Sequence, residues 1–493
     1  MATETVSTGF SPAEADLSPA SDQTTLKRNM QVIYLLLVSV FVVMLNETIM
    51  SVAIPPIMNS LSVTAAEAQW LTTAFLLTMA VVIPVTGFLL QRINTRPVFM
   101  LAMGLFCAGT FFAIFAPNLW FLVAARVVQA SGTAVMMPLL MTTVMTLVPP
   151  DQRGKMMGNI SIVMSVAPAV GPLVSGLILS VLDWRWLFIL VLPISIGAAW
   201  LGWKKISNVS EPRYAPLDIL SVILSAVAFG GIVYGISNIG APVAEGGIPA
   251  WAPLVVGAVT MVIFIWRQIA LQKTNSPLLD LRTLQSKNFT ISLTMMVICM
   301  AALFGSIILL PLYMQNVLGM DTWQIGLLLM PGALLMGLLG PQVGKLYDRV
   351  GPRPLIIPGM ITVSVVLWGM TLLGTGTWFG YILTGHLVMS VGFAFLFGPL
   401  FTASLSSIQP KFYSHGSAIL GSIQQVAGAA GVALFIALMT ATAASLTAEG
   451  MVPVEALAAG IRTGFLCGAI LSLFAIIASF FVQRPPTQPG FGH

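Results

Sequence analysis

Charged side chains are scarce in this chain of 493 residues: 8% of its residues are Asp, Glu, Lys or Arg, whereas 57% are hydrophobic. A soluble globular protein usually carries about 25% charged residues. A soluble fold of this length has too little interior to bury so much apolar side chain, and the lipid bilayer is the solvent that accepts it. The composition therefore excludes a soluble protein and predicts an integral membrane protein.

Other absences exclude kinds of chemistry. The three cysteines, Cys107, Cys299 and Cys467, each lie in a long apolar run without metal-ligand spacing, so we expect neither a disulfide framework nor a metal site. The sequence has no phosphate-binding Gly-rich loop, which excludes an ATP motor within the chain. It also has no cluster of acid, base or metal-binding groups at a membrane face, which argues against an enzyme. We therefore expect no cofactor, and a chemical gradient as the driving force.

Fourteen apolar runs are long enough to cross the bilayer, because about 30 Å of hydrocarbon requires roughly 20 helical residues. The sequence thus predicts an all-α bundle of fourteen membrane-spanning helices. They begin near Gln31, Trp70, Pro97, Leu119, Met156, Trp186, Leu217, Trp251, Phe289, Trp323, Pro354, Trp378, Ser417 and Thr463.

The net charge of +5 comes from basic residues in short loops, a pattern that indicates membrane topology rather than a nucleic-acid partner. Alternate loops are rich in Lys and Arg, and the loops between them are nearly free of positive charge except at Arg185 and Arg462. By the positive-inside rule the loops rich in Lys and Arg are cytoplasmic. We therefore expect the chain in the cytoplasmic (inner) membrane, with both termini in the cytoplasm. The rich set is Lys27, Arg28, Arg92, Arg96, Arg153, Lys155, Lys204, Lys205, Arg213, Lys273, Arg282, Lys287, Lys345, Arg349, Arg353, Lys411 and Arg484.

An internal repeat divides the chain. The segment 87–97 aligns without gaps with 344–354, and the two copies lie eight predicted helices apart. A duplicated six-helix unit with two inserted helices has that offset, and duplicated halves are typical of secondary transporters. We predict a disordered cytoplasmic tail over 1–30, which lacks the features of a cleaved signal peptide. After this tail we predict, in order, a six-helix bundle over 31–206, two inserted helices over 207–273, a second six-helix bundle over 274–483 and a cytoplasmic tail over 484–493.

Ionisable residues inside a span are costly and are therefore candidates for function. Glu47 lies toward the outer end of the first span, roughly 10–15 Å deep at 1.5 Å per residue. Arg126 lies in the fourth span at a comparable depth of roughly 10 Å. We interpret Glu47 as a carrier of protons or a partner of cationic substrates, in an ion pair with Arg126 that breaks on protonation. A permanent structural pair is the alternative.

Other polar groups in the spans are candidates of a second kind. His386 is a candidate for proton coupling or substrate contact, and a neutral, hydrogen-bonded histidine is the alternative. Amides and adaptable apolar side chains suit a promiscuous cavity, although they equally serve structure. The cavity candidates are Asn46, Gln129, Met136, Phe393, Gln424 and Gln425. Gly132 should let a neighbouring helix approach closely.

Two motifs suggest a change of conformation. Gly171, Pro172 and Gly176 in the fifth span favour bending and close helix packing. Asp348 follows the tenth span, where its carboxylate can meet the positive N-terminus of a helix in the other half and hold one conformation. The first-half counterpart is the uncharged Gln91, so its contact should be weaker. The two copies of this loop contribute Gly87, Gln91 and Arg92, and Gly344, Asp348, Arg349 and Arg353.

These motifs resemble those of a known family. The loop from Gly344 to Arg353 resembles the signature of the major facilitator superfamily, and 126–132 and 171–176 resemble its helix 4 and exporter-type helix 5 motifs. The segments 45–55 and 184–188 are similar to the fourteen-helix drug–proton antiporters of the EmrB/QacA type. The resemblance covers about 30–482 and implies the major facilitator fold, with efflux of amphipathic, often cationic, compounds in exchange for protons.

Two departures from the family pattern bear on mechanism. The family usually has Asp where this chain has Asn46, and the acid follows one position later at Glu47, about 100° around the helix. Gln91 replaces the usual Asp of the first loop. We expect small-molecule substrates, protons and lipid as partners of a monomeric multidrug transporter. The alternatives are a proton- or sodium-coupled transporter of one physiological solute, such as an amino acid, siderophore or lipid-like metabolite, and a receptor that binds without transport.

Overall fold

The computed structural model of the protein describes residues 19–208, 218–238, 249–274 and 276–484. Within these ranges the chain forms helices joined by short loops, without a β-strand. Fourteen of the described helices are long and apolar enough to cross a membrane. The predicted all-α class and the predicted number of spans are therefore confirmed.

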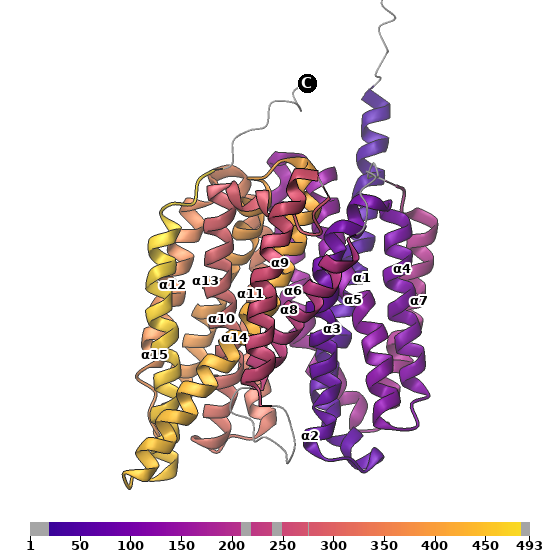
Figure 1. Ribbon diagram of the computed structural model, residues 1–493. Helices are drawn as coiled ribbons and strands as arrows, with labels where there is room; N and C mark the ends of the chain where they lie inside the picture. The colour runs from indigo at the N-terminus through magenta and orange to yellow at the C-terminus, as the bar shows by residue number, and fades with distance from the viewer. Residues whose placement is uncertain (1–18, 209–217, 239–248, 275, 485–493) are drawn as a thin grey trace, which may run out of the picture.

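The helix bounds follow the apolar runs of the sequence (Figure 1). In chain order the α-helices are α1 Pro19–Leu61, α2 Ala65–Ala68, α3 Trp70–Arg92, α4 Thr95–Ile114, α5 Leu119–Leu147, α6 Arg153–Leu179, α7 Arg185–Lys205, α8 Ile219–Ser237, α9 Trp251–Leu271, α10 Lys287–Asn316, α11 Thr322–Val350, α12 Arg353–Met370, α13 Phe379–Leu405, α14 Tyr413–Ala448 and α15 Pro453–Ser479. Short 3-10 helices at Pro150–Gln152, Gln272–Thr274, Leu281–Gln285 and Pro410–Phe412 connect some of them.

Three predicted span starts are too late. The spans expected to begin near Met156, Ser417 and Thr463 begin at Pro150, Pro410 and Pro453, and the first two of these starts include the 3-10 helices that precede α6 and α14. The sequence argument counted the apolar run alone, whereas these helices extend beyond it through polar residues. Prolines suit the first turn of a helix because the missing N–H has no helical partner there.

The predicted disordered tail over 1–30 is partly wrong, because α1 is helical from Pro19 onward. Once a helix is nucleated in its apolar span, each further residue adds a backbone hydrogen bond, so it extends past the membrane boundary. Residues 1–18, the start predicted at Leu217 with the basic Arg213, and the tail from 485 onward lie outside the described residues.

The helices pack in two groups. In the first group, α1, α3, α4, α5, α6 and α7 contact one another, and in the second group α10, α11, α12, α13, α14 and α15 do so. The two groups meet along two junctions, α6 with α11 and α3 with α14. Helices α8 and α9 pack together, and α8 contacts both α3 and α14, so this pair lies across one junction (Figure 1).

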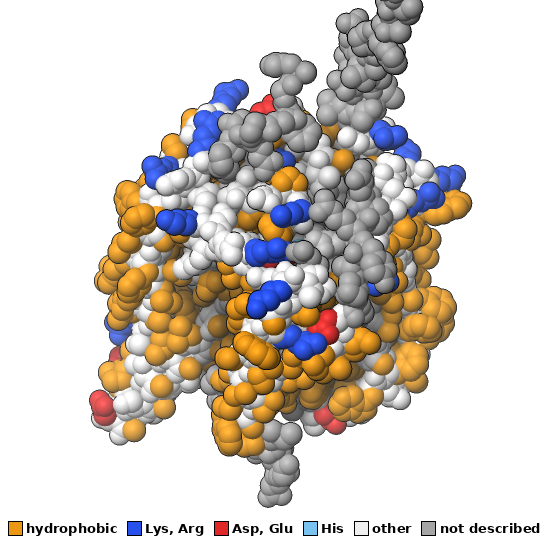
Figure 2. Space-filling view, turned by 45° about the horizontal axis from the view of Figure 1, so that its top comes forward, with side chains coloured by type: hydrophobic (Ala, Val, Ile, Leu, Met, Phe, Trp, Pro, Cys, Tyr) orange, Lys and Arg blue, Asp and Glu red, His pale blue; other side chains and the backbone are white. Residues whose placement is uncertain are grey.

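Lys and Arg side chains gather at the end of the bundle where α1 begins and the described chain ends, while apolar side chains cover its flanks (Figures 1 and 2). We call this the basic end, and the other the opposite end. Trp251, Trp323 and Trp378, which mark the opposite end, are 65%, 66% and 77% exposed. Exposed Trp at the edge of an apolar band suits the interface between lipid and water.

Candidate transport site

A buried arginine organises the first group of helices. Arg126 in α5 is only 2% exposed, and its Nη1 donates to Asn46 Oδ1 of α1 at 3.1 Å and to Gln129 Oε1 at 2.5 Å. Gln129 Nε2 in turn donates to Thr110 Oγ1 of α4 at 2.7 Å. The guanidinium lies 4.1 Å from the ring centroid of Phe75 in α3, a cation–π contact. Four helices thus converge on one charge.

Glycines bring these helices close enough for the network to form. A Cβ at Gly132 would lie 2.3 Å from the Ala102 carbonyl oxygen, and one at Gly109 would lie 2.5 Å from the Gln129 amide nitrogen. Such distances are below van der Waals contact, so α4 and α5 pack backbone to backbone. The close approach predicted for Gly132 is present, and α4 is the helix that makes it.

Glu47 differs from its neighbours in the described structure. Asn46 is 1% exposed, whereas the Glu47 side chain retains solvent-accessible surface. Within the part of the chain that the structure describes, its carboxylate has neither a hydrogen bond nor an ion pair, although its charge interacts with that of Arg126 over a longer distance. This carboxylate is therefore available to a proton or to a cationic group.

The predicted direct ion pair between Glu47 and Arg126 is wrong for this conformation. The guanidinium is instead bonded to two uncharged amide oxygens, those of Asn46 and Gln129. The reason is the rotation of α1: adjacent helical residues point about 100° apart, so Asn46 faces α5 when Glu47 does not. The positive charge of Arg126 therefore remains uncompensated by its direct partners.

The residue after Glu47 fixes α1 against α6. Thr48 Oγ1 donates to the Ala167 carbonyl of α6 at 3.3 Å. A Cβ at Gly171 would lie 2.1 Å from that hydroxyl oxygen, so only glycine fits there. The next motif residue, Pro172, cannot donate a backbone hydrogen bond, and Gly176 has no atom within 4 Å of a Cβ position. Glu47 thus lies between two anchored neighbours on α1.

The cavity candidates divide into two sets. Asn46, Gln129, Met136 and Phe393 are 0–1% exposed in this conformation, and the first two are committed to Arg126. In this conformation packing within each group covers these four side chains, and their place on a cavity surface stays a prediction. Gln424 and Gln425 of α14 remain partly accessible. Gln424 Nε2 contacts the Met300 sulfur at 3.9 Å.

His386 lies in the second group, apart from the Arg126 network. Its Nε2 is 3.0 Å from the Leu329 carbonyl of α11, and its Nδ1 is buried without a partner in the described structure. A Cβ at Gly332, one residue after Pro331, would lie 2.4 Å from Nε2. This ring therefore contacts α11 at a proline in mid-span.

The contact expected for Asp348 is present at the basic end. Asp348 Oδ1 accepts from the Gly154 N–H at 2.7 Å, and Oδ2 accepts from the Lys155 N–H at 2.8 Å. These two amides belong to the first turn of α6, whose N-terminus carries a partial positive charge that favours an anion. The Asp348 carboxylate of the second group thereby caps the N-terminus of α6 in the first group.

The same junction has its closest backbone contacts beside Asp348. A Cβ at Gly344 would lie 2.1 Å from the Gly154 carbonyl oxygen, and one at Gly158 would lie 2.3 Å from the Gly340 carbonyl oxygen. Two pairs of glycines, each four residues apart, therefore allow α6 and α11 to touch along a full turn. Of the other motif residues, Arg353 Nε donates to the Val482 carbonyl at 2.7 Å.

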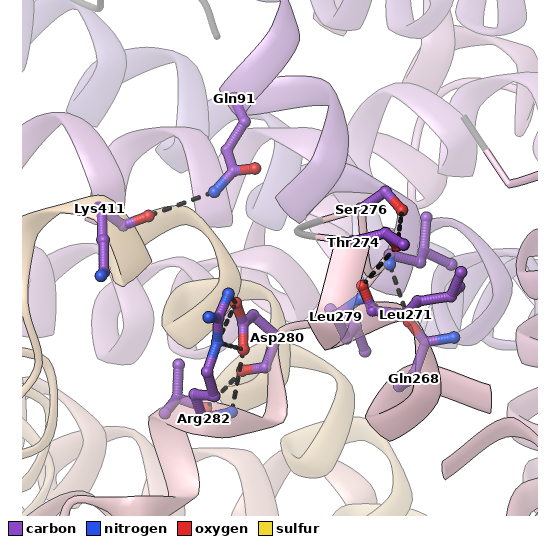
Figure 3. Close-up of polar contacts among 11 residues, drawn as sticks. Gln91, Gln268, Leu271, Thr274, Ser276, Leu279, Asp280, Arg282 and Lys411 are labelled. Atoms are coloured by element: carbon purple, nitrogen blue, oxygen red, sulfur yellow. Dashed lines mark hydrogen bonds and ion pairs between the residues drawn. The ribbon is translucent and has the colours of Figure 1, made fainter. Parts of the chain in front are cut away.

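The second junction is held by weaker groups. Gln91 Nε2 donates to the Lys411 carbonyl at 3.2 Å (Figure 3), an uncharged contact as the sequence predicted. Thr142 Oγ1 of α5 and Ser417 Oγ of α14 lie 2.8 Å apart. A Cβ at Gly87 would lie 3.1 Å from Ala418 Cβ, so α3 and α14 also pack closely.

Arg153 makes contacts between helices that the sequence did not predict. It was counted only as a loop charge, yet it is 6% exposed and donates to the Met145 and Val148 carbonyls at the end of α5. Its Nη1 also donates to the Tyr413 hydroxyl of α14 at 3.3 Å. Within the described residues, the hydrogen bonds between the two groups thus lie at the basic end, and the structure is closed there.

Replacing Asp348 with asparagine should open the basic end. Hydrogen bonds to a charged group contribute about 1.5–3 kcal/mol, so losing the charge should raise the open fraction about tenfold or more. In a variant without native cysteines, a cysteine at the buried Ser161 of α6 reports this opening through its rate of reaction with a maleimide. We expect at least tenfold faster labelling in Asp348→Asn and a smaller rise in the matched Gln91→Leu variant. Equal labelling rates in the unmodified protein, Asp348→Asn and Gln91→Leu would show that Asp348 does not hold the basic end closed.

Sequence similarity agrees with this geometry. The sequence model of the Major Facilitator Superfamily matches residues 36–432. The chain belongs to the major facilitator superfamily. It is accordingly a multi-pass membrane transporter rather than an enzyme. The superfamily predicted from the loop motifs is thereby confirmed, and so is its relation to drug-resistance members.

Relatives cover nearly the whole chain. The lincomycin resistance protein LmrB of Bacillus subtilis is 36% identical over 94% of this chain and 98% of its own length. LmrB of Listeria monocytogenes is 38% identical over 93% and 97%. A multidrug resistance protein B homolog of Mycobacterium tuberculosis is 28% identical over 80% and 73%. The solved proton:xylose symporter XylE shares the fold, with a TM-score of 0.64, 13% identity, and coverage of 93% of this chain and 96% of that one.

Proposed function

We propose that this major facilitator protein exports hydrophobic or amphipathic, often cationic, compounds in exchange for protons. The observation that carries the proposal is the Glu47 carboxylate, which retains accessible surface, has no bonded partner in the described structure and lies near the buried Arg126. A carboxyl group inside a span that can be neutralised suits a proton carrier, because intramembrane ionisable groups commonly mark proton and substrate paths.

The proposed cycle places the basic end in the cytoplasm of the cell, with both termini there and the chain in the cytoplasmic membrane. The described conformation is then closed toward the cytoplasm by Asp348 and Gln91. In this state a proton enters from outside, neutralises Glu47 and releases the substrate. After the halves rock, Glu47 gives its proton to the cytoplasm as the next substrate binds.

The substrate class rests on the relatives and on the chemistry of the described residues. Two relatives at 36% and 38% identity are named for lincomycin resistance, and a third for multidrug resistance. The partly accessible amides Gln424 and Gln425 offer neutral hydrogen-bonding groups, in addition to the accessible acid that we assign to coupling. We therefore take lincomycin as the first compound to test, and a monomer as the working unit.

The test is a flux assay in proteoliposomes with an imposed pH gradient or an imposed sodium gradient. We expect lincomycin and several cationic dyes to move against their own gradients when a pH gradient is present, and to stop when it is dissipated. Flux driven by sodium alone, or restricted to a single physiological solute, would contradict the proposed function. Binding without flux would indicate a receptor.

A further inference from the structure

Helices α8 and α9, which the proposed cycle leaves unused, are joined to the second group through buried hydrogen bonds. Gln268 of α9 is 0% exposed, and its Oε1 accepts from the Leu278 N–H at 2.7 Å and from the Leu279 N–H at 3.2 Å (Figure 3). Leu278 and Leu279 lie on the segment that leads into α10. One side chain therefore ties α9 to the entrance of the second group.

The same side chain ties α9 to α8. Gln268 Nε2 donates to Ser221 Oγ of α8 at 2.8 Å. The Ser221 hydroxyl donates to Asp218, whose two carboxylate oxygens accept from Arg267 Nε at 2.7 Å and Nη2 at 2.8 Å. The hydrogen bonds from Arg267 lower the pKa of Asp218 to about 2. The carboxylate therefore stays ionised as protons pass through the transporter, and this anchor does not open with the proton cycle.

The connecting segment is itself fixed to the second group. Asp280 is 3% exposed, caps Leu281–Gln285 and pairs with Arg282 at 2.6 Å (Figure 3). His415 of α14, which is 2% exposed, interacts with the Leu278 backbone and with the charge of Asp280. Ser286 Oγ then donates to the Ser407 carbonyl beyond α13 at 3.1 Å. Pulling α9 away from the second group would thus leave several buried polar groups without partners, which is unfavourable.

The contact of α8 with the first group is of another kind. A Cβ at Gly230 would lie 3.4 Å from Leu77 Cδ1 and 3.5 Å from Val81 Cγ2 of α3, which is ordinary apolar contact. Trp70 and Tyr234 stack with ring centroids 6.0 Å apart. Within the described residues no hydrogen bond joins α8 to α3, and a cleft of about 120 Å³ separates the two helices at the end opposite the basic end. Contacts without directional bonds can slide at little cost.

We propose that α8 and α9 move as one body with the second group and slide over α3, so that they keep covering the α3–α14 junction during transport. The proposal rests on the proposed alternation between two conformations. It gives the inserted pair a role that its position across both groups suggests, because a helix bonded equally to α3 and to α14 would oppose the rocking of one group against the other.

Cross-linking across the sliding contact tests this proposal. In a variant without native cysteines, Val81→Cys with Gly230→Cys should form a disulfide between α3 and α8, because a Cβ at Gly230 would lie 3.5 Å from a γ carbon of Val81. We expect at least a tenfold loss of lincomycin flux when the disulfide forms, and recovery when it is reduced. The single Gly230→Cys variant under the same oxidation is the control for the substitution itself. Full flux in the cross-linked protein would overturn the proposal, because α8 would then travel with the first group.

A distance measurement decides the matter without relying on flux. Spin labels at the exposed Val227 of α8 and Leu101 of α4 report the distance to the first group, and labels at Val227 and Val365 of α12 report the distance to the second. Comparing the protein with Asp348→Asn, we expect the first distance to change and the second to stay constant. Labels at Leu101 and Val365 report whether the two groups themselves move apart. A changed second distance, or a first distance that stays fixed while the Leu101–Val365 distance changes, would overturn the proposal. A lack of flux in the unmodified protein would instead reject the proposed function and leave this measurement valid.

Discussion

A disulfide between cysteines placed at Thr142 and Ser417 is expected to abolish transport. The two hydroxyl oxygens lie 2.8 Å apart, on α5 of the first group and α14 of the second, at the basic end. A transporter that alternates between two conformations must separate these residues to open that end. Because a disulfide holds its sulfurs about 2.05 Å apart, the oxidised protein should remain closed there, and a reducing agent should restore flux.

The measurement is lincomycin flux into vesicles before and after oxidation, with the native cysteines removed. We expect at least a hundredfold loss, limited by the fraction that stays uncross-linked. Ser364 and Ser472 supply a matched control, because their hydroxyl oxygens lie 2.7 Å apart on α12 and α15 of the same group. A disulfide there should leave flux unchanged. If the Thr142–Ser417 disulfide forms and flux persists, the basic end does not open along this junction.

Features that depend on composition and local spacing could be predicted from the sequence. The apolar runs define fourteen spans because a bilayer of fixed thickness requires a fixed helix length. The Asp348 contact could be expected from its charge complementarity with a helix start in the other half, although Asp348 lies in the last turn of α11 and not after the span as the sequence predicted. Both arguments need only the order of residues along the chain.

Features that depend on the rotation of a helix about its axis could not be predicted from the sequence. At equal depth, Glu47 and Arg126 suggested an ion pair, but Asn46 is the residue of α1 that faces α5. Likewise, Arg153 reads as one loop charge among many, and only the fold shows that it reaches Tyr413 of the other group. The link from Gln268 to Leu278 also could not be foreseen, because a single Gln near the end of an apolar run has no distinctive pattern.

Replacing Glu47 with glutamine should separate substrate binding from proton coupling. Glutamine keeps the shape and the hydrogen-bonding oxygen, yet it neither gains nor loses a proton near neutral pH. The Asn46 and Gln129 bonds to Arg126 do not involve this carboxylate, so the network around Arg126 should persist. We therefore expect the variant to reach the membrane in normal amounts and to lose at least a hundredfold in pH-driven accumulation. The matched Glu47→Asp variant should retain partial coupling because it preserves the carboxyl group.

The most direct measurement of the central claim is lincomycin accumulation in inverted membrane vesicles, whose interior is acidified, for the unmodified protein and for Glu47→Gln. The claim predicts accumulation in the first that collapses with the pH gradient, and none in the second. Accumulation by Glu47→Gln that still follows the pH gradient would show that another group carries the proton.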